Sequence, residues 1–255
     1  MICPIPLEFT SCRTALSLRD GPQILGCRTC RGSIANVEII ALQSGPAKAR
    51  AASATVAGIQ DLHPDIVMDT GTCAALDGDL SVNSIVIGVD CVEYDISGSG
   101  LPTRIIAEMR LPSAFRLLGR REAQKLVRAA AEIGNGLGLQ IRSGVQACGE
   151  FFIQSVQIRE SLHVISGAVA CNWETAGIFI GALRARIPPL SMRVVSDLGD
   201  EDSLRDFRKN ARGSAQELYR FTRSTIESGW LFEFHSQWKS LGRSQVDKMA
   251  QMVLP

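Results

Sequence analysis

The sequence predicts an α/β fold, a three-layer sandwich with a central mixed, largely parallel sheet flanked by helices. Apolar runs of strand length alternate along the chain with segments of helical pattern, and neither an internal repeat nor a disordered linker interrupts them. The 255 residues, 45% hydrophobic and 21% charged, suffice for one large domain with a sizeable core. In such sheets ligands gather at the C-terminal ends of strands.

The first half of the chain opens with the strand-like segment "MICPIP". A strand is then predicted over 37–45, ending in a Ser-Gly loop, and an Ala-rich helix over 47–62. Buried strands follow over 64–76, broken at Gly71, and over 84–95. The segment 97–115, with "SGSGLPTR", is the most loop-like part of the chain.

The second half begins with an amphipathic helix over 120–134, closed by Gly134, and a strand over 141–153. A helix over 172–186 is stopped by a Pro-Pro pair, a strand covers 190–197, and a long helix covers 203–228. The tail from Trp230 differs in character. We expect the loops after Leu42, Met68, Ala147 and Val195 to share one crevice.

Charge and hydropathy exclude several classes of partner. The net charge of +1 gives no field that would attract nucleic acid or an anionic membrane, and no apolar run approaches the length of a membrane span. The start, "MICPIPLEF", lacks the order of a signal peptide. We therefore expect a cytoplasmic protein whose partner is a small molecule, with no nucleic acid and no membrane.

The eight cysteines do not form a metal-site pattern. Only Cys27 and Cys30 have ligand spacing, and no second pair or His-x-His partner accompanies them. The sequence therefore favours reduced, structural thiols, with no metal and no cofactor. No G-x-S-x-G motif marks a nucleophilic serine.

The stretch "SMRVVSDLGDEDS" (191–203) raises a functional question. An apolar strand ends there in Ser196-Asp197, so Asp197 is either an acid that takes part in chemistry or a solvated loop residue.

Four stretches, in order and spacing, carry a resemblance: "PIPLEF", "LQSGPAKARAA", "PDIVMDTGTCAAL" and "NWETAGIF…MRVVSD". Over residues 1–228 the chain resembles the purine nucleoside phosphorylase superfamily, and most closely its methylthioadenosine/S-adenosylhomocysteine nucleosidases. The resemblance implies a nucleoside phosphorylase-like catalytic domain over 1–228, with 229–255 as a C-terminal extension of unknown role.

The resemblance also implies two catalytic carboxyl groups. Asp197 matches the family's general acid, which would protonate N7 of a leaving purine, and a dry pocket raises an Asp pKa in the required direction. Glu8 matches the carboxylate that activates water against the anomeric carbon. This division of labour is that of the glycosidases.

Further positions match substrate-binding residues of the family. Glu174 would accept hydrogen bonds from ribose hydroxyls, Arg193 would lie near the ribose and the water, and Ser196 would orient Asp197 or the base. The remaining matches are Phe152, which would stack on the base, Ile153, which would contact it through its backbone, and Thr72 and Ala74, on the loop that approaches the ribose.

Each assignment has a structural alternative. Glu8 could cap a helix that starts near Thr10, and Glu174 could favour a helix dipole. Phe152 and Trp173 could be ordinary core residues.

The chain departs from the family pattern around the ribose. Asn172 stands where a second acid is common, and Trp173 replaces a smaller Met. Ala47, Ala74 and Ala75 replace glycines, and each added methyl intrudes where backbone normally approaches a ligand.

The nucleophile expected from these residues is water. Related phosphorylases carry an Arg where Asp69 stands, and a carboxylate there would repel phosphate. We therefore expect hydrolysis of the N-glycosidic bond of a 5′-substituted adenine nucleoside, with release of adenine. A phosphate-dependent phosphorylase and a non-catalytic nucleoside-binding domain remain the alternatives. The resemblance also implies a homodimer in which 97–115 reaches toward the partner's site.

Overall fold

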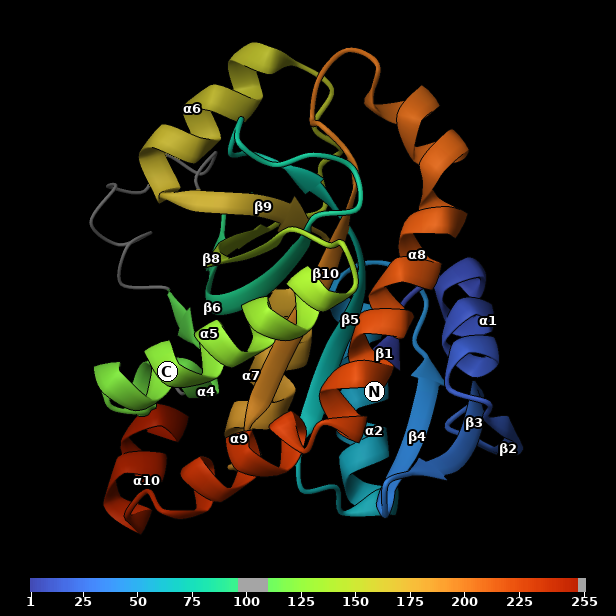
Figure 1. Cartoon of the computed structure of the whole chain (residues 1–255), viewed down its shortest axis with the longest axis vertical. Coiled ribbons are helices and arrows are strands. Elements are labelled where there is room, and N and C mark those ends of the chain that lie inside the picture. The colour runs from blue at the N-terminus through green and yellow to red at the C-terminus, as the bar shows by residue number, and fades with distance from the viewer. Residues whose placement is uncertain (96–109, 252–255) are drawn as a thin grey trace.

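The computed structural model describes residues 1–95 and 110–251 of the chain, and it has the layered α/β architecture expected from the sequence (Figure 1). Its strands are β1 (Ile2–Cys3), β2 (Arg19–Ile24), β3 (Cys27–Ile34), β4 (Val37–Gln43), β5 (Val67–Ala75), β6 (Ile85–Glu93), β7 (Leu111–Pro112), β8 (Ile141–Cys148), β9 (Ala168–Asn172) and β10 (Pro189–Asp197). Its helices are α1 (Pro6–Ala15), α2 (Lys48–Leu62), α4 (Ala114–Leu117), α5 (Arg120–Gly136), α6 (Val156–Ser166), α7 (Thr175–Arg184), α8 (Ser203–Glu227), α9 (Trp230–Lys239) and α10 (Arg243–Gln251).

The described strands form one mixed sheet in the order β10-β6-β8-β9-β5-β1-β4-β3-β2, with β7 paired to β6. Strand β10 also pairs with β5, so β5, β10, β6, β8 and β9 close on themselves. The pairs β1–β4, β1–β5, β5–β10, β6–β8 and β8–β9 are parallel, and the other pairs are antiparallel. This closure brings the C-terminal ends of β5, β9 and β10 to one place.

Helices cover the sheet and complete the core. Helix α8 packs against β10 and β5 and lies beside α1, and α2 packs against α7 (Figure 1). The largest apolar cluster contains fully buried aromatic side chains from both ends of the chain, including Phe9, Phe179, Tyr219 and Phe221. Burial of such rings is the main stabilising term for a core of this kind.

The chain after α8 packs on the same core. Gly229, at φ +77°, separates α8 from α9. In α9 the Phe234 ring lies 5.3 Å from the ring of Phe115, and Trp230 donates its indole N–H to the carbonyl oxygen of Leu126 at 2.8 Å. The division at residue 228 stays a prediction; it coincides with the turn between these two helices.

Three predicted elements differ from those observed. The expected strand 141–153 ends at Cys148, and Gly71 does not break β5, which continues to Ala75. The expected helix 172–186 begins only at Thr175, because Ala168–Asn172 is a fully buried strand. Alanine-rich β9 has little strand propensity of its own, so its pairing with β5 and β8 decides its conformation.

Several elements were not expected at all. They include the hairpin β2–β3, strand β9 and helices α6, α9 and α10. Of the loop-like segment 97–115, residues 97–109 lie outside the described residues.

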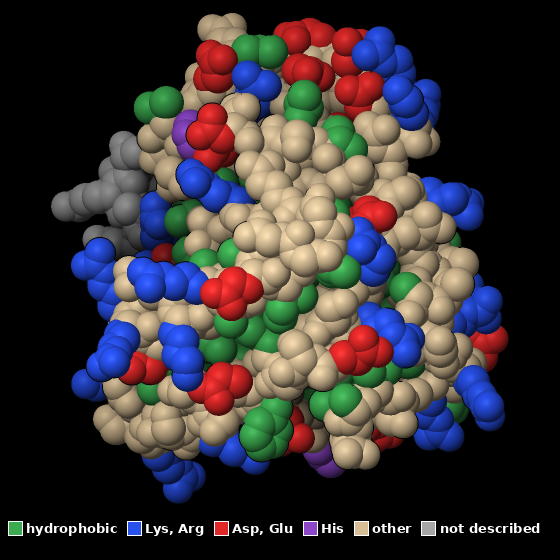
Figure 2. All heavy atoms as spheres, in the orientation of Figure 1, with side chains coloured by type: hydrophobic (Ala, Val, Ile, Leu, Met, Phe, Trp, Pro, Cys, Tyr) green, Lys and Arg blue, Asp and Glu red, His purple; other side chains and the backbone are tan. Residues whose placement is uncertain are grey.

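The surface in Figure 2 carries both signs of charge, with Lys and Arg side chains interspersed among Asp and Glu. None of the described helices combines the length and apolarity needed to cross a membrane.

Candidate active site

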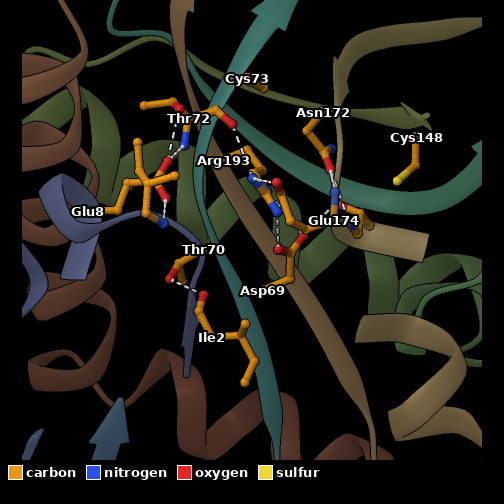
Figure 3. Close-up of polar contacts among 12 residues, drawn as sticks. Ile2, Glu8, Asp69, Thr70, Thr72, Cys73, Cys148, Asn172, Glu174 and Arg193 are labelled. Carbon is orange, nitrogen blue, oxygen red and sulfur yellow. Dashed lines mark hydrogen bonds and ion pairs between the residues drawn. The ribbon is translucent and has the colours of Figure 1, made fainter. Parts of the chain in front are cut away.

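Glu8 lies in the first turn of α1, beside β5 (Figure 3). Its Oε1 accepts two hydrogen bonds from Thr72, from the backbone N–H at 2.7 Å and from the hydroxyl at 2.9 Å. Its Oε2 accepts the backbone N–H of Ile5 at 3.1 Å. Burial raises the pKa of Glu8 to about 7, against the opposing effect of the Arg193 charge. A carboxyl group with that pKa can take a proton from water near neutral pH.

Gly71 makes room for this carboxylate. A Cβ at this position would lie 2.8 Å from Oε1 of Glu8 and 3.0 Å from Nη1 of Arg193. Its φ of +154° is also one that side chains rarely adopt. The glycine that was expected to break the strand therefore lets an acid and a guanidinium approach the same strand.

Arg193 is the buried cation of the site, with 1% of its surface exposed. Its Nη1 donates to the carbonyl oxygen of Thr72 at 3.1 Å and to Oε2 of Glu174 at 3.0 Å. Its Nε and Nη2 both donate to the carboxylate of Asp69. Asp69 is fully buried and its carboxylate is directed at Arg193, although from the sequence we expected it at a position where it would repel phosphate.

Glu174 links α7 to the loop before α2. Its Oε1 accepts the backbone N–H of Ala47 at 3.1 Å, and burial raises its pKa although Arg193 opposes the shift. Ala47 has φ +82°, a conformation suited to the glycine that the family carries there. The chain keeps the glycine-like backbone and adds a methyl group.

Asn172 shapes the site through the backbone of α7. Its Oδ1 accepts the N–H groups of Glu174 at 3.0 Å and Thr175 at 2.9 Å, and its Nδ2 donates to Oε1 of Gln146 at 3.1 Å. The side chain is 6% exposed. An Asx turn of this kind fixes the start of the helix and hence the place of Glu174.

Asp197 ends β10 at an irregularity in the pairing with β5, which breaks the side-chain alternation between Val195 and Asp197. Its Oδ2 accepts the hydroxyl of Ser196 at 2.9 Å and its Oδ1 accepts the N–H of Gly199 at 3.4 Å. Burial raises the pKa of Asp197 to about 6, although these bonds oppose the shift. A carboxyl group of this kind holds a proton far more often than an exposed Asp does.

Glu8 and Asp197, the two acids whose pKa values are raised, both lie beside strand β5. Thr72, which binds Glu8, pairs with Val194, and Ala74 pairs with Asp197. Two strand residues span about 7 Å, so the two acids are attached at neighbouring places along β5. The strand pairing therefore brings both acids to the same part of β5, as a general acid and a general base acting on one substrate require.

Two aromatic side chains stand beside this region. The rings of Phe152 and Trp173 are half-buried and meet edge to face, with centroids 6.0 Å apart. Trp173 directly precedes Glu174, so it brings this pair next to the carboxylate cluster. The side chain of Ile153 is 3% exposed and packs in an apolar cluster.

Within the described residues, no group of three or more His, Cys, Asp or Glu side chains has the arrangement of a metal site. All eight cysteines are free thiols. One cavity, of about 510 Å³, lies at the other end of the strands, where β4 and β5 begin, and none of the candidate acids lines it.

Two features of the site were not found from the sequence. One is the contact of Ala47 with Glu174, which joins positions 127 residues apart and leaves no local signal. The other is the set of donors around Asp69, which includes the hydroxyls of Thr175 and Ser191. The Asn172-x-Glu174 spacing could have indicated the Asx turn.

Comparisons with known proteins identify the family of the chain. The family model described as Phosphorylase superfamily matches residues 4–227. The 5′-methylthioadenosine/S-adenosylhomocysteine nucleosidase of Staphylococcus aureus (strain MRSA252) is 26% identical over 201 residues, which are 78% of this chain and 86% of that protein. The protein of the same name from Staphylococcus haemolyticus (strain JCSC1435) is 26% identical over 192 residues, 74% of this chain and 82% of that one.

Solved structures share the fold. The futalosine hydrolase of Helicobacter pylori strain 26695 superposes with a TM-score of 0.76 at 23% identity, over 89% of this chain and 96% of that one. The 5′-methylthioadenosine/S-adenosylhomocysteine nucleosidase of Neisseria meningitidis, in complex with methylthio-immucillin-A, gives a TM-score of 0.73 at 21% identity, over 89% and 97% of the two chains. With a family match that covers most of its length, the chain belongs to the phosphorylase superfamily.

Proposed function

We propose that the protein hydrolyses the N-glycosidic bond of a 5′-substituted adenine nucleoside and releases adenine. The observation that carries the proposal is the pair of buried carboxyl groups, Glu8 and Asp197, whose pKa values burial raises to about 7 and about 6. They reach the same stretch of β5 from two different elements. A general base and a general acid on the two sides of one sugar carbon are what such a hydrolysis needs.

Asp197 acts on the leaving group. In its protonated form it donates a proton to N7 of the purine, so that the base leaves as a neutral molecule. Ser196 donates its hydroxyl to Oδ2 and thereby orients the carboxyl group.

Glu8 acts on the nucleophile. Oε1 is held by two donors on Thr72, so the carboxylate has a fixed direction before substrate arrives. It accepts a proton from the water as that water attacks the anomeric carbon. Glu174, anchored by Arg193 and Ala47, supplies negative charge and hydrogen-bond acceptors beside the oxocarbenium-like sugar.

The loop that would cradle a phosphate is already occupied. At the start of α2 the backbone N–H groups of Ala47 and Lys48 donate to Glu174 and Glu150. The Lys48 ammonium group contacts Glu93 at 2.9 Å and Asp95 at 2.8 Å. Because protein carboxylates hold these donors, a phosphate dianion would have to displace them. This arrangement favours water over phosphate as the nucleophile.

The similar proteins point to the same chemistry. The two staphylococcal relatives are named for cleavage of methylthioadenosine and S-adenosylhomocysteine, and the Helicobacter structure is a futalosine hydrolase. The 5′ group of the substrate differs among these names. We accordingly propose the class of substrate and leave the 5′ group to experiment.

The test is incubation with 5′-methylthioadenosine, S-adenosylhomocysteine, 5′-deoxyadenosine and an aminofutalosine-type nucleoside in phosphate-free buffer, followed by chromatography of the released base. Adenine from at least one nucleoside supports the proposal. Release that requires phosphate would indicate a phosphorylase, and tight binding without release would indicate a nucleoside-binding domain.

We also propose that the active form is a homodimer, as the family resemblance implies, and that it is located in the cytoplasm. Light scattering at micromolar concentration tests the first point: a fully active monomer would contradict it.

A further inference from the structure

One guanidinium in this site faces three buried carboxylates. Arg193 donates to Asp69 and Glu174, and Glu8 and Arg193 both approach Gly71, where an added Cβ would lie 2.8 Å from Glu8 and 3.0 Å from Arg193. The three acids are 0%, 5% and 2% exposed for Asp69, Glu174 and Glu8, so water screens little of their charge. The distribution of the Arg193 charge among these three carboxylates therefore decides whether the site can bind an anion such as phosphate.

Asp69 accepts more hydrogen bonds from Arg193 than any other described residue does. It accepts two of the four hydrogen bonds that Arg193 makes with described residues, from Nε at 3.2 Å and from Nη2. The arrangement is the two-pronged pairing in which Arg binds a carboxylate most firmly. Thr72 and Glu174 receive the other two bonds. At most one of the five guanidinium N–H groups remains for a ligand.

Asp69 is itself fixed in place. Its Oδ2 accepts the hydroxyls of Thr175 at 2.6 Å and Ser191 at 2.7 Å in addition to the Arg193 bond. These donors come from the first residue of α7, directly after Glu174, and from β10, which carries Arg193. Asp69, which is fully buried on β5, thus connects β5 to α7 and β10 through hydrogen bonds.

We propose that Asp69 is a positioning residue that anchors Arg193 and cancels its charge, and that it thereby commits this site to water rather than phosphate as the nucleophile. The inference rests on the proposed hydrolysis and deepens it. Phosphate binding needs a guanidinium with free N–H groups and uncompensated positive charge. With Asp69 in place Arg193 keeps at most one free N–H group and its charge is compensated, so its remaining role is to hold Glu174.

The same charge balance acts on the general base. The titratable and charged groups around Glu8 are Arg193 on β10, Cys73 on β5, Glu174 before α7 and Tyr219 on α8. Asp69 acts on Glu8 through its ion pair with Arg193. Without the negative charge of Asp69, Arg193 would stabilise the Glu8 carboxylate more strongly and lower the pKa of Glu8. Because the pH optimum lies midway between the pKa values of base and acid, it would move by half of that shift.

The experiment compares Asp69→Asn with the wild type and with a matched control, Asp90→Asn. Asp90 is also a buried acid paired with an arginine, Arg116, but lies outside the site. Hydrolysis is measured from pH 5 to 9 and with increasing inorganic phosphate, and folding is checked by circular dichroism. Asp69→Asn should move the optimum down by about half a pH unit and lower the inhibition constant for phosphate by about tenfold. Asp90→Asn should change neither.

A folded Asp69→Asn protein in which either property equals that of the wild type would overturn the inference. If Asp69→Asn does not fold, Arg193→Gln is compared with Asp69→Asn/Arg193→Gln, which removes both charges. The single variant should move the optimum up, and the double variant should return it at least halfway. The inference would also be overturned if the double variant had the same pH optimum as Arg193→Gln alone. A wild type that releases no adenine would instead refute the proposed function.

Discussion

Glu8 and Thr72 are joined twice: one carboxylate oxygen accepts both the backbone N–H of Thr72 at 2.7 Å and its hydroxyl at 2.9 Å. The residues are 64 positions apart, on α1 and β5. The double contact fixes the direction of the carboxylate that we propose as general base. A mutation of Thr72 can remove the hydroxyl contact and leave the backbone contact in place.

Thr72→Val should therefore slow the reaction with little change in folding. Loss of a hydrogen bond to a charged group should lower kcat by about tenfold and leave KM nearly unchanged. Thr55→Val is the matched control, because the buried Thr55 hydroxyl has no hydrogen-bond partner among the described residues. Steady-state kinetics of both variants measure the effect. Equal kcat values for Thr72→Val and Thr55→Val would mean that the Thr72 hydroxyl does not orient Glu8.

The pH dependence of kcat/KM should be bell-shaped, with its maximum between the pKa values of Asp197, about 6, and Glu8, about 7. The active form has Glu8 ionised and Asp197 protonated, so activity falls both below and above the pH of the maximum.

Asp197→Asn should lower kcat by roughly 10²–10⁴ and still bind substrate. A flat profile between pH 5 and 8, or a near-normal kcat in Asp197→Asn, would remove the acid–base assignment.

The buried base should also make the fold less stable at high pH. The pKa of Glu8 rises from 4.5 to about 7 in the folded protein, so the folded state holds this proton more tightly than the unfolded chain does. Stability contributed by the protonated form is present below pH 4.5 and is lost as the pH rises to 7. The loss is at most about 3 kcal/mol.

Glu8→Gln should remove this loss. Chemical denaturation of both proteins at pH 5 and pH 8 measures it. The variant should lose less unfolding free energy than the wild type between the two values; parallel losses would show that Glu8 titrates normally.

Ala47 should be a strained residue. Its φ of +82° disfavours any residue with a Cβ, and the strain costs about 1 kcal/mol or more. Ala47→Gly should therefore stabilise the fold by about 1 kcal/mol, and it keeps the N–H bond to Glu174. Ala49→Gly, in the exposed first turn of α2, should destabilise by a similar amount. Thermal unfolding of both variants should show shifts of opposite sign.

The fold and part of the site follow from the sequence for identifiable reasons. An apolar run that ends in Ser196-Asp197 predicts a strand that delivers a carboxylate, and β10 does so. The role of Glu8, by contrast, came only from the resemblance, because an acid in the first turn of a helix is common for other reasons.

Other features depend on contacts between distant parts of the chain. The position of Asp69 beneath Arg193 arises from the pairing of β5 with β10, and no local pattern encodes it. Strand β9 was not predicted, because its five residues carry no local strand pattern and its pairing partners lie far away in sequence. Only its last residue, Asn172, fell within the helix predicted over 172–186.

The most direct test of the central claim is the origin of the oxygen on the released sugar. Hydrolysis of an active nucleoside in H₂¹⁸O, with and without inorganic phosphate, is followed by mass spectrometry of the sugar. The account predicts one ¹⁸O atom on the anomeric carbon under both conditions, one adenine per sugar, and a rate that Glu8→Gln lowers by roughly 10²–10⁴. A sugar 1-phosphate, or an unchanged rate in Glu8→Gln, would contradict it.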